Sequence, residues 1–263
     1  MKNIVQILCS ILVVLTSNFL GAQTTIATNF TNNNGSSIIT FNFQNTNATD
    51  VVITEIASAT GTTGANSATL WYKPTAINQT TMAVNTGAGW TQVVTQPFTG
   101  VANTTTNVGQ PMLTGLSLIV PAGATYGLCL SITSSLRYST ITAGSYTFTG
   151  GGCNLITGTD IGFGGTLTSG INNRGFIGSV SFISGTACTG TPNAGVTATA
   201  TNPVCPSVPF NLTMANATFT SGLTYQWQSA PSAAGPWTNI PGGNTPGFAA
   251  SQLVDTWYQC IVT

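Results

Sequence analysis

The stretch that decides the fold lies near the C-terminus and reads Tyr225-Gln226-Trp227-Gln228, followed by Trp257-Tyr258-Gln259-Cys260. A further cysteine, Cys205, precedes both runs. A tryptophan placed between two strand-borne cysteines is typical of an immunoglobulin-like sandwich, in which a disulfide joins the two sheets and packs on the indole. The pattern therefore predicts a Cys205–Cys260 disulfide, with Trp227 and Tyr258 in the structural core.

The composition indicates a folded chain with an almost uncharged surface. The 263 residues suffice for one large β domain or two smaller ones. Only 3% of the residues are charged, against roughly a quarter in ordinary globular domains. Because 42% are hydrophobic and are spread in short alternating runs, disorder is a poor interpretation. The surface must be built from Thr, Asn, Ser, Gln and Gly.

The few charges exclude one class of function. Histidine is absent, and the charged residues are Lys2, Lys73, Arg137, Arg174, Asp50, Glu55, Asp160 and Asp255. Nucleic-acid binding requires a basic stripe that neutralises many phosphates, so the sequence predicts no nucleic-acid partner.

The N-terminus has the pattern of a secretory signal peptide. Lys2 supplies a short positive region, an apolar run extends from Ile4 to Leu20, and small residues precede Gln23. These features predict a signal peptide over residues 1–22 and export of the remainder. No later run approaches the roughly 18 apolar residues of a spanning helix, so no transmembrane segment is expected after cleavage.

From Thr24 onward, short runs alternate between apolar and polar residues. Each run is rich in β-branched or aromatic residues and is bounded by Gly, Asn, Pro or Ser, as in strands. The predicted strands of residues 23–184 are Ile38–Phe43, Val51–Ile56, Ala68–Lys73, Trp90–Phe98, Leu116–Val120, Thr125–Thr133, Leu136–Ile141, Ser145–Thr149 and Phe176–Ile183. So many short strands predict a two-sheet sandwich of jelly-roll type.

A shift in composition marks a domain boundary. Residues 185–196 contain almost no large apolar side chain and are predicted to be a linker. Residues 197–263 are predicted to be the Ig-like module. The predicted fold is therefore all-β, with an N-terminal jelly-roll-like sandwich followed by an Ig-like sandwich.

Several motifs of the second module occur in the order seen in one family. They run from Cys188-Thr-Gly-Thr-Pro through Gly222-Leu-Thr-Tyr-Gln-Trp-Gln-Ser229 and Gly235-Pro-Trp-Thr-Asn-Ile240 to Trp257-Tyr-Gln-Cys-Ile-Val-Thr263. This segment resembles the Ig-like repeats of secreted, multidomain, adhesin-like surface proteins of Bacteroidota, which are usually type IX secretion substrates. Residues 24–184 resemble more loosely the β domain that often precedes such repeats.

The resemblance also implies a departure from the family pattern. Family members commonly carry another cysteine after the Val-Thr with which this sequence stops. The Ig-like domain is therefore expected to be cut before its last strand, and Cys188 to pair with a cysteine beyond it. A free Cys188 is the alternative.

The remaining cysteines allow one further bridge, between Cys129 and Cys153. A metal site is not expected, because histidine is absent and no two cysteines have a C-x-x-C spacing. A calcium site needs several carboxylate oxygens, and the sequence has too few carboxylates to supply them. The sequence predicts no metal and no cofactor.

Catalysis has few possible carriers. Without histidine there is no Ser-His-Asp or Cys-His arrangement. A glycosidase needs two carboxylates across the scissile bond, and the first domain offers only Asp50, Glu55 and Asp160, in no recognisable motif. The sequence therefore predicts that the protein is not an enzyme.

A carbohydrate site is the functional candidate that the first domain leaves open, because lectin-like sandwiches stack sugars on exposed aromatic rings beside polar side chains. Trp71 and Tyr72 are neighbours on one strand and should face opposite sides. In the alternative interpretation, these aromatic residues fill the core and the charges form a structural pair. The candidate ligand-binding residues are Trp71, Tyr72, Trp90, Tyr138, Asp160 and Arg174.

Together these observations favour a non-catalytic protein, secreted or at the cell surface, with an adhesive or structural role and with Ig-like repeats as a stalk. Extracellular glycans or other surface proteins are the expected partners. The alternative is a carbohydrate-binding module that serves a downstream catalytic domain.

Overall fold

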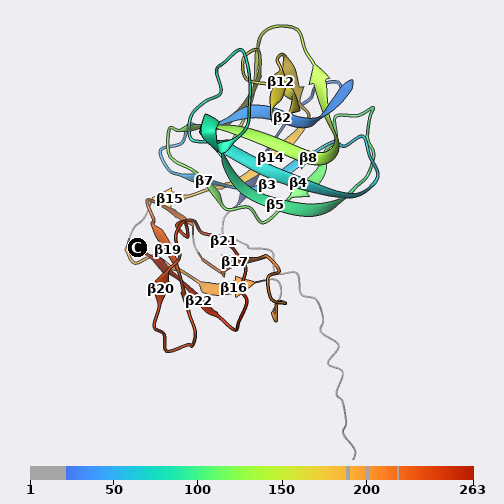
Figure 1. The fold of residues 1–263 in the computed structure, drawn as a ribbon. Helices are drawn as coiled ribbons and strands as arrows, with labels where there is room; N and C mark the ends of the chain where they lie inside the picture. The colour runs from blue at the N-terminus through green and yellow to red at the C-terminus, as the bar shows by residue number, and fades with distance from the viewer. Residues whose placement is uncertain (1–21, 188–189, 200–201, 218) are drawn as a thin grey trace, which may run out of the picture.

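The computed structural model describes residues 22–187, 190–199, 202–217 and 219–263, and these form two successive β-sandwiches (Figure 1). The predicted all-β fold, with an N-terminal jelly-roll-like sandwich followed by an Ig-like sandwich, is confirmed. The predicted signal peptide and Cys188 lie outside the described residues, apart from Ala22. No helix in the described ranges has the length and apolar character needed to span a membrane.

One sheet of the N-terminal sandwich is antiparallel and has the order β1-β14-β3-β6, with β7 also paired to β3. Its first strand pairs with its last along the chain, because Gln23 lies opposite Ile183. The strands are β1 (Gln23–Ala27), β3 (Val51–Ser58), β6 (Gln110–Leu113), β7 (Leu118–Val120) and β14 (Gly178–Ser184).

The other sheet is larger and has the order β12-β11-β2-β10-β13-β8-β4-β5, with β9 paired to β10. Two strands predicted separately, Thr125–Thr133 and Leu136–Ile141, form the single strand β8, which also pairs with β2. The strands are β2 (Asn34–Asn45), β4 (Gly64–Lys73), β5 (Thr91–Gly100), β8 (Thr125–Thr140), β9 (Ser145–Gly150), β10 (Cys153–Gly158), β11 (Gly164–Thr166), β12 (Ser169–Ile171) and β13 (Arg174–Phe176).

The main core lies between these two sheets. Because side chains alternate along a strand, Ile39, Phe41 and Phe43 of β2 point into it, where Phe41 stacks on Phe176 and Phe43 packs edge-on against Phe182. All three β2 side chains are fully buried. At about 1.5–3 kcal/mol for each buried large apolar side chain, this layer supplies much of the stability of the domain.

The outer face of the larger sheet is also covered, by the loops around residues 74–90 and 160–168. Ile38 of β2 points to this side and packs with Phe163 in a second core. Polar residues of the same strand hold the loops in place, because Asn42 Nδ2 donates to the Ile77 carbonyl (3.0 Å) and Thr40 Oγ1 donates to the Ile161 carbonyl (2.6 Å). The first of these loops contains the short 3₁₀ turn η1 (Thr86–Ala88).

The C-terminal sandwich is smaller and has two three-stranded sheets, ordered β16-β17-β21 and β20-β19-β22. Trp227 on β19 is fully buried between them, and its Nε1–H donates to the Thr245 carbonyl (2.9 Å). Tyr258 is half-buried and packs edge-on against Phe210. The strands are β16 (Val196–Thr199), β17 (Phe210–Ala215), β19 (Tyr225–Ala230), β20 (Thr238–Asn239), β21 (Phe248–Ala250) and β22 (Trp257–Val262).

The segment predicted as a linker takes part in the structure. Its residues Thr186–Ala187 form β15, which pairs in parallel with β18 (Thr220–Ser221) of the C-terminal half. The segment between the sandwiches is therefore tied to the C-terminal half by a strand pairing as well as by the covalent chain.

The structure contradicts both predicted disulfides, because Cys129, Cys153, Cys205 and Cys260 are free thiols. Cys129 lies opposite Thr40 of β2, whereas Cys153 lies opposite Asn45. The two sites are thus about 16 Å apart along the strand direction and on opposite faces of the sheet, beyond the reach of a disulfide.

The expected Cys205–Cys260 bridge fails for a different reason. Cys205 lies in an exposed turn that precedes β17, not on the strand itself. Cys260 lies opposite Trp227 in β22 and packs against the core of the C-terminal sandwich. The two thiols therefore occupy an exposed loop and a half-buried strand position.

Candidate functional site

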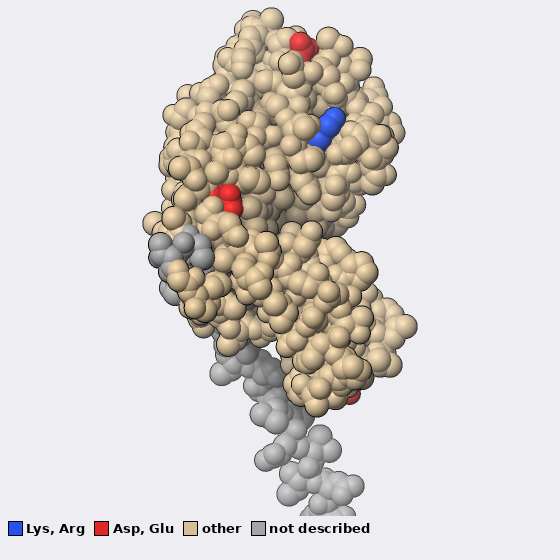
Figure 2. Space-filling model, turned by 90° about the vertical axis from the view of Figure 1, so that its left-hand side faces the viewer, with Lys and Arg blue, Asp and Glu red and all other residues tan. Residues whose placement is uncertain are grey.

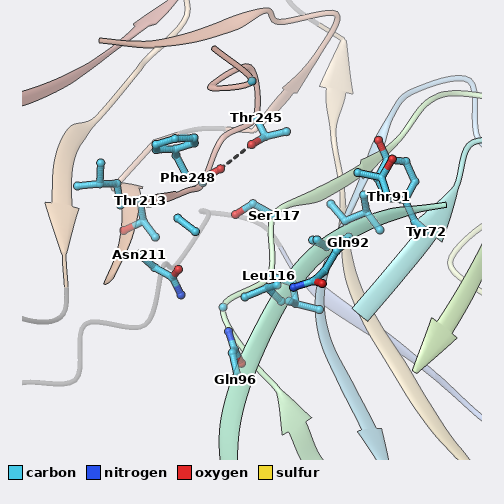
Figure 3. A pocket seen from close by; sticks show the side chains of 18 of the residues that line it. Tyr72, Thr91, Gln92, Gln96, Leu116, Ser117, Asn211, Thr213, Thr245 and Phe248 are labelled. Carbon is cyan, nitrogen blue, oxygen red and sulfur yellow. Dashed lines mark hydrogen bonds between the residues drawn. The ribbon is translucent and has the colours of Figure 1, made fainter. Parts of the chain in front are cut away.

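A groove of about 300 Å³ lies between the two sandwiches. Figure 3 shows side chains of both halves facing one another across it. The volume is at the lower end of the roughly 300–1,000 Å³ range of small-ligand sites. The lining residues come from β4, β5 and the segment before β7 on one side, and from β17, β21 and the loop before β21 on the other.

The N-terminal wall of the groove is the edge strand β5. It pairs with β4 on one side and is the last strand of its sheet on the other. Gln92 and Gln96 of this strand line the groove. Gln96 is fixed, because its Nε2 donates to the Thr114 carbonyl and its Oε1 accepts from the Thr114 N–H, both at 2.9 Å. Gln92 is exposed and retains a free carbonyl oxygen in the described structure.

Tyr72 gives this wall its aromatic surface. Its ring is half-exposed and stacks on Tyr126, with centroids 5.4 Å apart and an interplanar angle of 26°. Burial, reinforced by the nearby phenol of Tyr72 and the Asp50 carboxylate, raises the pKa of Tyr126. The stacked ring therefore stays neutral at physiological pH and supports Tyr72 as a rigid platform.

The C-terminal wall consists of β17 and the loop that leads into β21. Alternation along β17 buries Leu212 and turns Asn211 outward to the groove. Phe248 adds a second half-exposed ring, and Asn244 adds a second side-chain amide. In the described ranges no hydrogen bond occupies either amide. The hydrogen bond from Trp227 to Thr245 anchors this loop to the core.

Among the residues that the structure describes, no charged side chain lines the groove. The wider surface is similar, since Figure 2 shows only isolated charged side chains on a face that is otherwise uncharged. Two aromatic rings beside unoccupied amides suit a ligand that is neutral, has an apolar face and carries many hydroxyl groups. An ion or a phosphorylated ligand would find no countercharge here.

The structure brings only one of the six candidate ligand residues to this groove. Trp71 and Tyr72 face opposite sides of the sheet, as predicted, and Tyr72 is the one that lines the groove. Trp71 packs into the second core, under the loop of residues 74–90. Trp90 is only 2% exposed and belongs to the same core. Trp90 is therefore out of reach of a ligand at the surface, while the half-buried Trp71 lies on the side of the sheet away from the groove.

The other three candidates have structural partners. Tyr138 is buried, and the Arg174 guanidinium lies 5.2 Å from the centre of its ring, which is a cation–π contact. Asp160 Oδ1 accepts from Asn172 Nδ2 (2.7 Å), and its N–H donates to Asn172 Oδ1 (2.8 Å). Tyr138 therefore fills the core, as in the structural interpretation, but Asp160 and Arg174 have these partners and form no ion pair with each other in the described structure.

The groove itself was missed at the sequence level, because its walls come from two domains. Gln92 and Gln96 lie on an edge strand next to the strand of Tyr72, but a register shift between them breaks the alternation, so simple periodicity does not place both on the groove. Nothing in the sequence pattern pairs that strand with Asn211 or Phe248.

The described residues contain no group of three or more His, Cys, Asp or Glu side chains that could hold a metal ion. Comparison with models of known protein families finds no match for this chain, and no curated protein is significantly similar to it.

Proposed function

We propose that the protein is a non-catalytic binding protein, secreted or at the cell surface, that holds an uncharged glycan in the interdomain groove as part of an adhesive role. The observation that carries the proposal is the lining of the groove, which combines the rings of Tyr72 and Phe248 with open amides and no charge. Sugars are recognised by stacking on such rings and by hydrogen bonds to amide groups.

The scarcity of acid–base groups supports a role without catalysis. Asp160 is engaged by Asn172, and Asp50 is engaged by backbone amides. Neither carboxylate lines the groove. A glycan held there meets no pair of carboxylates of the kind that glycosidases place across the scissile bond.

The direct test is a glycan array probed with residues 23–263, followed by calorimetry on any hit. We expect neutral glycans to bind, and Tyr72→Ala and Phe248→Ala each to weaken binding about fivefold or more, since loss of one stacking ring costs about 1–3 kcal/mol by analogy with stacking on bases. Asn244→Ala should weaken it less. Tyr146→Ala and Asn107→Ala are matched controls outside the groove.

Binding that is unaffected by Tyr72→Ala and Phe248→Ala would move the glycan site elsewhere on the protein. Absence of any glycan ligand, combined with binding of a surface protein that Tyr72→Ala abolishes, would replace the glycan with a protein partner.

A further inference from the structure

Asp50, which directly precedes β3, lies where the two sandwiches meet. Its carboxylate accepts two hydrogen bonds from opposite sides of the junction. Oδ1 accepts from the Ala122 N–H of the N-terminal sandwich (3.0 Å), and Oδ2 accepts from the Gly222 N–H of the C-terminal sandwich (3.1 Å). Charge-assisted bonds of this kind are about twice as strong as neutral ones.

The backbone of the same residue is equally engaged. The Asp50 N–H donates to Ser221 Oγ (3.0 Å), and the Asp50 carbonyl accepts from the Gly185 N–H (2.8 Å). One residue thus connects the β7–β8 loop, the segment after β14, and the residues that follow Phe219 in the C-terminal half.

An apolar cluster lies beside these polar contacts. Phe219 of the C-terminal half is 4% exposed and packs with Val52 and Ile183, with Ile119 of β7 against them. Gly185 allows its backbone to lie close to Phe219 and Asp50, because a Cβ there would lie 2.9 Å from the Phe219 ring and 3.1 Å from the Asp50 carbonyl oxygen. The junction therefore excludes water on one side and is hydrogen-bonded on the other.

The junction and the groove share a segment of chain. Leu116 and Ser117 line the groove, while Ala122, a few residues further along, contacts Asp50. Ser117 also approaches the opposite wall, since a Cβ on Gly247 would lie 2.8 Å from Ser117 Oγ. The segment that contacts Asp50 at the junction thus also forms part of the groove wall.

We propose that Asp50 is a positioning residue that locks the alignment of the two sandwiches and so holds the interdomain groove open at its binding width. The effect of Asp50 on ligand affinity rests on the proposed function of the groove as a glycan site. A pre-formed site avoids the ordering cost that two loosely tethered halves would meet on binding.

The experiment compares Asp50→Ala, Asp50→Asn and the wild type, all as residues 23–263. Hydrogen exchange of the Ala122 and Gly222 amides in the unliganded protein reads the junction directly. Loss of a hydrogen bond to a charged group should speed exchange about tenfold or more in Asp50→Ala. Asp50→Asn should have a smaller effect, because an amide keeps one acceptor oxygen. Ser221→Ala should also loosen the junction, and Asp255→Asn, an exposed acid elsewhere, should not.

A second readout separates positioning from simple destabilisation. The Trp227 amide, which donates to the Gly243 carbonyl (2.6 Å), should exchange at the same rate in all variants if both sandwiches stay folded. Glycan affinity should then fall in Asp50→Ala in step with faster exchange at Gly222.

Unchanged exchange at Ala122 and Gly222 in Asp50→Ala would overturn the proposal. Faster exchange with unchanged glycan affinity would overturn it too, because the groove would then not depend on the junction. If the wild type binds no glycan, the proposed function fails, while the exchange rates still decide whether Asp50 locks the alignment.

Discussion

The two sandwiches differ in how they treat the outer faces of their sheets. The N-terminal sandwich covers the outer face of its larger sheet with its own loops, so that strand β2 is buried on both sides. In the C-terminal sandwich, strand β17 buries alternate residues only and leaves Asn211 outward. The first domain thus covers its own sheet, while the second leaves one face of a sheet exposed toward its neighbour. The groove lies where strands β4 and β5 of the first domain approach that face.

The largest effect should come from Trp227→Ala, which tests whether the C-terminal core depends on one side chain. Trp227 is fully buried and is the largest residue of that core. Truncation should lower the free energy of unfolding of this sandwich by about 3–5 kcal/mol. Limited proteolysis should then cleave within residues 196–263 and leave the N-terminal sandwich intact.

Phe41→Ala is the matched variant in the other domain. It should cost a similar free energy, yet residues 23–184 should stay resistant to protease at 25 °C, because their core extends over two larger sheets. If Trp227→Ala and Phe41→Ala made their domains equally sensitive to protease, the two cores would not differ in how much they depend on one side chain.

A smaller effect is expected from Gly185→Val, which acts on the boundary between the domains. The added side chain would meet the Phe219 ring and the Asp50 carbonyl oxygen, and crowding of this kind costs about 1–3 kcal/mol. Differential scanning calorimetry should show a lower melting temperature, with the two domains unfolding in separate steps. Ala187→Val, at an exposed strand position two residues further along, is the control.

Alkaline pH should weaken the C-terminal sandwich gradually. Burial raises the pKa of Tyr225 to about 12 and that of Cys260 to about 11, above their ordinary values of 10.0 and 9.0. Between pH 9 and 12 the unfolded chain therefore releases protons that the folded chain keeps, and stability falls as pH rises through this window. The urea midpoints of unfolding at pH 7 and pH 11 measure this loss of stability. In Tyr225→Phe the difference between the two midpoints should be smaller.

The smallest effect on stability should follow modification of Cys205. Its thiol is exposed, whereas burial raises the pKa of Cys153 to about 11 and also raises that of the fully buried Cys129. A thiol reagent at pH 8 should label Cys205 first, with the melting temperature unchanged within error, and Cys129 only on unfolding. Four unreactive cysteines in the unfolded, unreduced protein would instead show that disulfides form.

Sequence patterns predicted most strands because a half-buried strand repeats every two residues. They missed β10 (Cys153–Gly158), whose run Asn-Leu-Ile-Thr follows several glycines, and they divided β8 at Ser134-Ser135. The second core was not foreseen, because the loops that cover Trp90 have no periodic pattern.

The site was predicted only in part, for a related reason. Alternation predicted that Trp71 and Tyr72 face opposite sides of a strand, but it did not show which of the two would line a site. The rest of the groove depends on how the two domains meet, and that contact is made by Asp50, Gly185 and Phe219, none of which carries a motif. The Cys129–Cys153 prediction failed because spacing along the chain does not show which face of a sheet a cysteine occupies, and the Cys205–Cys260 prediction failed because Cys205 precedes the strand on which it was expected.

The pairing of β1 with β14 has a consequence for how the chain folds. Gln23 and Ile183 are partners, so the smaller sheet lacks a completed edge until the last strand of the domain has been synthesised. Contacts between such distant residues delay closure and slow folding. During synthesis of the domain, β1 therefore stays without its partner strand until β14 has emerged.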